Sequence, residues 1–217
     1  LQKHSRWRHK GLKWTFRDPY NLLDEKKRRA VRSLLLFAFS MWSEALKGRL
    51  NFHQVSNLST IGRNDNFQKP PDVDIDIFFA KGDHGDKELN FKEINGNCNL
   101  TRHQIPLKFG MGLSEDLLVQ RTKKAFDGVG GMVAHSEYPP KGVMHLDADE
   151  KWSFDGSIGI DLRYTLIHEI GHLLGLRHSR KSTSVMNKYY RKFPIGTRYL
   201  PYVDVYSIRR LYGVTMN

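Results

Sequence analysis

Three histidines and a glutamate fall within eleven residues of the chain, in the stretch HEIGHLLGLRH that runs from His168 to His178. On a helix, residues four apart lie one above the other, so His168 and His172 present their imidazoles from one face. Such a pair is a typical clamp for zinc. Glu169 follows the first histidine directly, which places its carboxylate beside the metal rather than on it.

A third ligand requires the chain to turn back after this helix. Gly175 stands three residues after His172, where a residue without a Cβ atom can leave the helix in a left-handed conformation. The chain can then return and bring His178 to the metal. Three neutral imidazoles leave the fourth zinc position to water, whose pKa zinc lowers to about 7. Glu169 can accept its proton as the water attacks a carbonyl, so the expected chemistry is amide hydrolysis.

The alternative is that these are ordinary histidines, which is the usual explanation of a single histidine on a helix. That alternative requires three histidines, a glutamate and a glycine to occur together at these fixed offsets by chance. Met186 stands eight residues after His178, which is consistent with a tight turn whose methionine packs beneath the zinc. Taken alone, it would be an ordinary core residue. The metal site is the preferred interpretation.

The elements around this stretch indicate an α+β chain. The segment from Leu22 to Leu46 carries apolar residues at helical spacing, has Asp24 as its N-cap and should end near Gly48. There is no internal repeat and no βαβ rhythm, which favours the α+β class. Strands are expected at WTFRD, LNFHQV, VDIDIFFA, GGMVAHSEY and GVMHLDA, and a closing helix at VDVYSIRRLYG.

Length and local composition predict the domain organisation. With 217 residues and 39% apolar content, the chain can close one sizeable core. We expect a basic, flexible N-terminal arm over residues 1–13 and one domain over residues 14–217. Residues 87–124 are polar, contain turn signals and one candidate helix, and indicate a surface insertion. No apolar run approaches the ~20 residues of a membrane-spanning helix.

The formal net charge of +12 favours adhesion to anionic surfaces such as sulfated glycans, phospholipid headgroups or nucleic acid. A generally basic, solvated surface explains the charge equally well, and no nucleic-acid-binding motif accompanies it, so no specific nucleic-acid partner is expected. Asn57 and Asn99 match the N-glycosylation pattern of secreted chains. The single cysteine, Cys98, excludes an internal disulfide and leaves open whether it is buried, free or paired with another chain.

HExxHxxGxxH followed by a methionine turn resembles the metzincin proteases. Ser179 directly after the third histidine, together with the RRLYG ending, is similar to the matrix metalloproteinase catalytic domain. FSMWSEAL, IFFAKGDHGD, AFDGVGGMVAH and MHLDADEKW match that family in order. The resemblance implies the metzincin fold, with a twisted, mostly parallel five-stranded sheet and three main helices. It also implies that His168, His172 and His178 bind catalytic zinc, that Glu169 is the general base and that Met186 forms the floor of the zinc site.

The same resemblance implies structural metals. Three histidines and one aspartate would form a closed four-ligand zinc shell, although each histidine taken singly is unremarkable. Calcium demands six or more oxygen ligands, and the alternative for its site is an ordinary glycine-rich turn with solvated acids. A further calcium is disfavoured, because Lys141 and Val143 stand where oxygen ligands would be expected. The implied ligands are His84, Asp86, His135 and His145 for structural zinc, and Asp127, Gly128, Gly130, Met132, Asp147 and Glu150 for calcium.

Three departures from the family concern the substrate cleft. The interval between Asp86 and Phe126 holds 39 residues, where the family has only a few. Lys188-Tyr189-Tyr190 replaces the family's Pro-X-Tyr pocket wall, and Tyr164 falls where the depth of the pocket is set. We therefore expect Tyr164 and Tyr190 to line a shallow pocket that prefers small or medium apolar side chains just after the scissile bond.

The resemblance implies a secreted zinc endopeptidase, monomeric and at the cell surface or in the matrix, that cleaves extracellular matrix or secreted proteins. Protein inhibitors and sulfated glycans are the further partners expected. The family's inhibitory propeptide motif and propeller are not found, so we expect the catalytic domain alone. The rival hypothesis is a metal-stabilised binding or scaffold domain with weak or no turnover that uses its basic surface; the intact Glu169 argues against it. An astacin or adamalysin is disfavoured by Ser179 and the second histidine cluster.

Overall fold

The computed structural model describes residues 5–55, 69–82, 98–101, 126, 128–190, 194 and 196–216, with residues 98–101 described by their backbone alone. Of the expected metal ligands, His84, Asp86 and Asp127 lie outside these ranges, as does Asn57. Most of the expected insertion, including its candidate helix, lies outside them too. Within the described ranges, no helix is both long enough and apolar enough to span a membrane.

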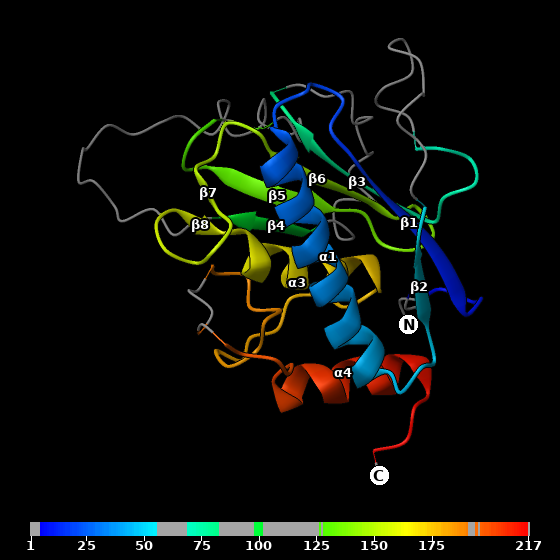
Figure 1. Ribbon diagram of the computed structural model, residues 1–217. Helices are drawn as coiled ribbons and strands as arrows, with labels where there is room; N and C mark the ends of the chain where they lie inside the picture. Colours follow the sequence, from blue (N-terminus) through cyan, green and yellow to red (C-terminus); the bar gives the residue numbers. More distant parts are fainter. Residues whose placement is uncertain are drawn as a thin grey trace, which may run out of the picture.

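A six-stranded sheet forms one layer of the domain (Figure 1). Its strands are β1 (Gly11–Arg17), β2 (Asn51–Gln54), β3 (Ile75–Ala80), β4 (Cys98–Thr101), β5 (Met132–Ser136) and β6 (Val143–Asp147). They lie in the order β2-β1-β3-β6-β5-β4; the first four are parallel, and β5 is antiparallel to both of its neighbours. The mostly parallel sheet is confirmed, and it has one strand beyond the expected five because β4, from the insertion, pairs with β5.

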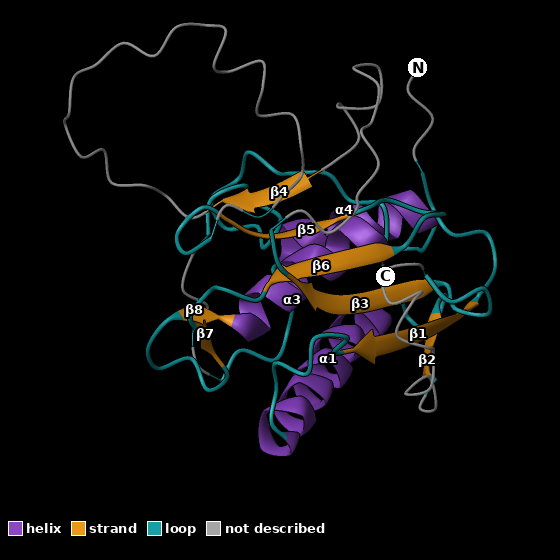
Figure 2. Cartoon of the chain, turned by 90° about the horizontal axis from the view of Figure 1, so that it is seen from above, coloured by secondary structure: helices purple, strands orange, loops and turns teal. Residues whose placement is uncertain are grey.

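Three helices lie on one side of the sheet in both views (Figures 1 and 2): α1 (Glu25–Ala45), α3 (Leu162–Leu173) and α4 (Tyr202–Tyr212). Helix α1 begins where predicted, because the Asp24 carboxylate accepts a hydrogen bond from the Lys27 N–H at 2.8 Å. The chain leaves it through Gly48, at φ 71. The two-residue strands β7 (Trp152–Ser153) and β8 (Ile160–Asp161) pair just before α3. The predicted α+β class with three main helices is confirmed.

The core lies between the sheet and the helices and holds α3 in place. Trp42 of α1 is fully buried, and its indole N–H donates to the Ile167 carbonyl of α3 at 3.0 Å. A buried indole needs such a partner, and its large apolar surface makes it a strong packing anchor. Helix α3 is therefore fixed against α1 on one side and the sheet on the other. The largest fully buried side chains include Trp14, Leu35, Ile75, Ile77, Phe78 and Met144.

The N-terminal residues differ from the flexible arm that was expected. Strand β1 begins at Gly11, earlier than the predicted start at Trp14. Ahead of it, Trp7 is 6% exposed, and its indole N–H donates to the Leu173 carbonyl at the end of α3 at 2.8 Å. The basic neighbours of Trp7 suggested a solvated segment, but one buried tryptophan is enough to anchor it.

Candidate metal centre

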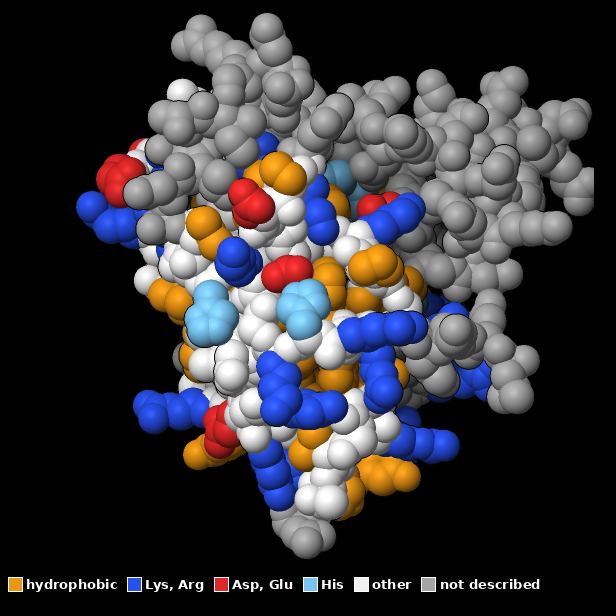
Figure 3. All heavy atoms as spheres, turned by 90° about the vertical axis from the view of Figure 1, so that its right-hand side faces the viewer, with side chains coloured by type: hydrophobic (Ala, Val, Ile, Leu, Met, Phe, Trp, Pro, Cys, Tyr) orange, Lys and Arg blue, Asp and Glu red, His pale blue; other side chains and the backbone are white. Residues whose placement is uncertain are grey.

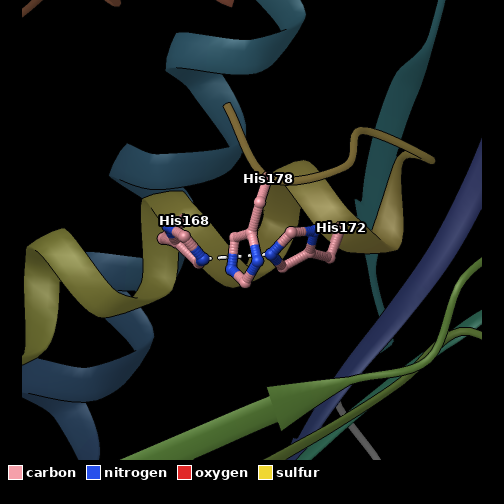
Figure 4. Close-up of side chains that lie close together, drawn as sticks. All are labelled: His168, His172 and His178. Carbon is pink, nitrogen blue, oxygen red and sulfur yellow. Dashed lines mark hydrogen bonds between the residues drawn. The ribbon is translucent and has the colours of Figure 1, made fainter. Parts of the chain in front are cut away.

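Helix α3 carries the first half of the histidine motif. Its N-terminus is capped by Asp161, whose carboxylate accepts a hydrogen bond from the Tyr164 N–H at 3.3 Å. Every residue of the helix except Arg163 is buried. His168 and His172 lie one turn apart, and their Nε2 atoms are 2.9 Å apart (Figure 4). The helical spacing has thus placed two imidazoles side by side in a buried position.

The chain reverses at Gly175, as the spacing predicted. Its φ of 101° lies in the left-handed region, and a Cβ atom there would be 2.1 Å from the Ser5 carbonyl oxygen. The reversal brings the His178 ring centroid to 5.4 Å from that of His168 and 5.1 Å from that of His172. One ligand nitrogen from each ring lies within 4.8 Å of the others, and Figure 4 shows the three rings converging.

Main-chain carbonyls fix the orientation of the two helix-borne rings. Nδ1 of His168 is 2.6 Å from the Val185 carbonyl, and Nδ1 of His172 is 2.6 Å from the Leu176 carbonyl. A carbonyl only accepts, so each Nδ1 carries the proton and each Nε2 keeps its lone pair. Burial lowers the pKa of His168 to about 3 and lowers that of His172 well below its usual value. Both imidazoles are therefore neutral at pH 7.

These three residues fit a zinc ion. Zinc–nitrogen bonds of about 2.0 Å at tetrahedral angles separate ligand nitrogens by roughly 3.3 Å, close to the 2.9 Å between the first two rings. Their outer nitrogens are held by carbonyls, which is how zinc-binding histidines are usually oriented. His178, which is more open to solvent, has its pKa lowered by burial and by the nearby Lys188. Three protein ligands leave one position open, as catalytic zinc requires.

Glu169 is a buried acid on the same helix. It is fully buried, and neither of its carboxylate oxygens has a hydrogen-bond partner among the described residues. Burial raises its pKa to about 8, and the nearby Ser136 hydroxyl opposes that shift to a smaller extent. Ser136 was not predicted as a site residue. The signal for it was the alternation along β5, which turns Ser136 away from His135 and towards α3.

Met186 lies in a turn held from two sides. A Cβ atom at Gly171 would be 2.3 Å from its sulfur, so the methionine packs directly under α3. Its carbonyl accepts a hydrogen bond from the Ser179 N–H at 2.8 Å. The buried Asp204 carboxylate of α4 accepts from the Val185 N–H at 2.9 Å and from the Ser184 hydroxyl. Asp204 was not predicted as a site residue, and the signal for it was an acid on the inward side of an amphipathic helix.

The two tyrosines expected in the substrate pocket are in contact. Their rings meet edge to face at 5.3 Å. Tyr164 is 2% exposed, and its hydroxyl donates to the Val185 carbonyl at 3.3 Å. The Tyr190 hydroxyl accepts from the Asp161 N–H at 2.7 Å. The phenol of Tyr164 therefore packs between the start of α3 and the methionine turn.

Two members of the second histidine cluster lie within the described residues. His135 and His145 are direct partners in the β5–β6 ladder, and Nδ1 of His145 is 3.0 Å from Nε2 of His135. Both are buried, and the Phe126 ring lies 5.1 Å from His135. The other two expected ligands, His84 and Asp86, fall outside the described ranges, so the four-ligand zinc shell stays a prediction.

Some of the expected calcium ligands come together. The Glu150 carboxylate accepts a hydrogen bond from the Gly130 N–H at 2.6 Å, and Gly130 has a φ of 96°. Asp147 is fully buried at the end of β6. Calcium binding stays a prediction. The remaining expected positions are Asp127, which lies outside the described residues, and Gly128 and Met132, which flank Gly130 along the chain.

Comparison with known proteins gives a family match and several relatives. The Matrixin family matches residues 87–213, which is more than half of the chain. The chain is 32% identical over 216 residues to karilysin of Tannerella forsythia, covering 96% of this chain and 34% of karilysin. It is 33% identical over 210 residues to metalloendoproteinase 2-MMP of Arabidopsis thaliana, covering 92% and 40%. It is 29% identical over 216 residues to matrix metalloproteinase-16 of Rattus norvegicus, covering 96% and 27%. The chain thus spans two fifths or less of the length of these relatives.

Proposed function

This chain belongs to the matrixin family, and from that premise we propose that it is a zinc-dependent endopeptidase with Glu169 as its general base. One observation carries the proposal: three histidines converge at one point, and the helix that supplies two of them also carries Glu169, a buried carboxylate without a hydrogen-bond partner among the described residues. The names of the relatives support it, since they include a metalloendoproteinase and a matrix metalloproteinase.

Each residue of the site has a role in this proposal. His168, His172 and His178 would hold the zinc, which when bound polarises a carbonyl and lowers the pKa of water. Glu169 accepts a proton from the attacking water and returns it to the leaving amine. Burial raises the pKa of Glu169 to about 8 in the metal-free protein, and a dication held by the three histidines would lower it again and favour the carboxylate form that accepts a proton. Met186 and Asp204 keep the ligands in position from below.

A substrate would bind in extended form along the sheet. β-Strand addition supplies affinity through main-chain hydrogen bonds and selectivity through side-chain pockets. Strand β5 is already paired with β6 and β4, so among the described strands β4 forms the edge at this end of the sheet. The buried phenol of Tyr164 against Tyr190 favours a shallow pocket and a small or medium apolar side chain after the scissile bond. A cleavage profile dominated by long aromatic residues there would reject this preference.

The wider setting is part of the same proposal. We infer a secreted protein acting on extracellular matrix or other secreted proteins, because relatives named matrix metalloproteinases cover nearly the whole chain. The adjacent His135 and His145 support a second, structural zinc. The contact between Glu150 and Gly130 supports an oxygen-lined calcium site. A monomer and sensitivity to protein inhibitors are expected on the same basis.

Hydrolysis of a quenched peptide library by the wild type and by Glu169→Ala tests the proposal. Loss of the base should lower the rate by about 10³-fold while zinc content stays unchanged. Glu44→Ala, which removes an exposed glutamate from α1, is the matched control and should keep full activity. An inactive wild type that still holds zinc would favour the rival scaffold domain. Activity that survives Glu169→Ala would contradict the mechanism.

A further inference from the structure

The C-terminal ends of α1, α3 and α4 meet at one end of the molecule, and the N-terminal residues cross over them. The Arg209 guanidinium of α4 donates to the Ala45 carbonyl of α1 at 2.7 Å. Trp7 donates to the Leu173 carbonyl of α3, and Arg6 donates to the Leu211 carbonyl of α4 at 2.7 Å. Segments far apart in sequence thus form one continuous surface.

This surface is strongly basic. The segments that form it, residues 5–10, 44–51 and 209–216, contain a single carboxylate, Glu44. Figure 3 shows Lys and Arg side chains gathered on this side of the molecule. The Lys10 carbonyl accepts from the Asn51 N–H at 2.8 Å, which places the N-terminal cations beside those that follow α1. We call it the basic face, and its cations are Arg6, Arg8, Lys10, Lys47, Arg49, Arg209 and Arg210.

Helix capping explains only part of this charge. The C-terminus of a helix carries about half a negative charge, so three of them offset about 1.5 positive charges. Glu44 offsets one more, which leaves an excess of about 4.5 positive charges. Arg6 and Arg209 are the cations bonded to helix-end carbonyls. Four exposed cations of the face have no carboxylate partner among the described residues: Arg8, Lys10, Arg49 and Arg210.

We propose that the basic face binds a sulfated polysaccharide. Guanidinium groups hold tetrahedral oxyanions through paired hydrogen bonds, and five of the seven cations of this face are arginines. A reader of single-stranded nucleic acid would be expected to present aromatic rings for stacking, but Trp7 and Tyr212 are buried here, and a duplex is left to the test below. A lipid-binding face would need several exposed apolar side chains, and on these segments Met216 is the one large apolar side chain counted as exposed. A polymer with repeated sulfate groups matches the remaining features.

The proposal does not depend on the protease assignment, and the test separates the two. Binding of a heparin oligosaccharide is measured in about 0.15 M salt, where exposed charges more than about 8 Å apart are largely screened. The face variant is Arg8→Ser/Lys10→Ser/Arg49→Ser/Arg210→Ser, which spares the two capping arginines. The matched control removes four exposed cations elsewhere: Lys26→Ser/Arg29→Ser/Lys151→Ser/Arg198→Ser.

The face variant should bind roughly tenfold more weakly or worse, because four modest ion pairs are lost together, and the control should change less than about threefold. Equal losses in both variants would mean adhesion by net charge and would overturn the proposal. Unchanged binding by the face variant would also overturn it. Duplex DNA or anionic vesicles binding as tightly as heparin would reject the sulfated ligand. Glu169→Ala should bind heparin like the wild type, and the face variant should keep its rate on short peptides.

Discussion

The two histidine clusters of this protein are built in different ways. His168, His172 and His178 come from one helix and the turn that follows it, all within eleven residues. His135 and His145 come from neighbouring antiparallel strands, and their expected partners lie on a distant segment. Helical spacing fixes the first cluster locally, whereas the second depends on strand register and on the path of the chain. A site of the first kind can be located from sequence far more securely.

The clusters also differ in how their rings are held. Two carbonyls accept from the outer nitrogens of His168 and His172 and fix which nitrogen is protonated. The strand pair is instead flanked by aromatic rings, with Phe78 4.3 Å from His145. We call His168, His172 and His178 the helix cluster, and His135 and His145 the sheet cluster. We therefore expect the helix cluster to be preorganised for metal binding, and the sheet cluster mainly to stabilise the fold.

The largest expected effect comes from breaking the helix cluster. His172→Ala should abolish zinc binding at this site and lower peptide hydrolysis by about 10³-fold or more, since Glu169 alone cannot activate water well. Elemental analysis for zinc and a peptide assay measure both effects. His53→Ala, which removes an exposed histidine from β2, is the control and should change neither. Retained activity in His172→Ala would mean that the convergence of the three rings has no catalytic role.

The second prediction concerns the turn at Gly175, which brings the third ligand, His178, back to the metal site. Gly175→Ala should lower the free energy of unfolding by about 3 kcal/mol, because it combines a positive φ with a Cβ only 2.1 Å from the Ser5 carbonyl. Gly213→Ala is a matched control, since Gly213 also has positive φ but open space around it. It should cost about 1 kcal/mol. Urea unfolding of both variants gives the difference, and equal losses would show that the close approach to Ser5 is unimportant.

The third effect concerns the sheet cluster. His145→Ala should remove one zinc per chain and leave peptide hydrolysis by the folded protein nearly unchanged. With free zinc at about 100 times the dissociation constant, the lost binding should cost about 2.7 kcal/mol of stability. Phe78→Leu, a buried neighbour without a ligand atom, is the control for altered packing. A variant that keeps two zincs, or that loses activity before stability, would contradict the division of roles.

The same contrast explains which parts of the fold and of the site could be predicted from the sequence. The α3 histidines, the reversal at Gly175 and the Asp24 cap were predictable, because each follows from spacing or from the conformation that one residue type allows. The packing of Trp7 was not, because its basic neighbours favour a solvated segment and its partner is the end of α3, far along the chain.

Two other features could not be predicted from the sequence, for the same physical reason. Strand β4 pairs with β5 from within a polar insertion, and no local pattern identifies its partner. Asp204 holds the methionine turn through a hydrogen bond to Val185, a contact between residues about twenty positions apart. Contacts of this kind are set by the tertiary fold, so sequence periodicity predicted the elements but not these links between them.

The smallest effect is the pH dependence of the zinc-free protein, which reports how deeply the helix cluster is buried. Burial holds the pKa of His168 at about 3 and that of His172 well below its usual value, so the folded state keeps both neutral near pH 6. In the unfolded chain their pKa is about 6.5, so below that pH the unfolded state binds protons that the folded state does not.

Glu169, whose folded pKa of about 8 makes the folded state take up a proton in the same window, opposes this effect, so it is measured in a Glu169→Gln background. There the free energy of unfolding should fall as pH falls, by about 1.4 kcal/mol for the pair between pH 7 and pH 6. The size depends on the unfolded pKa alone, because neither folded histidine titrates in this window. Urea unfolding at the two pH values measures it, and His172→Gln should halve the change while the exposed His53→Gln leaves it intact. Equal stability of the Glu169→Gln protein at both pH values would mean that His168 and His172 exchange protons freely in the folded state, and the helix cluster would not be sealed from solvent.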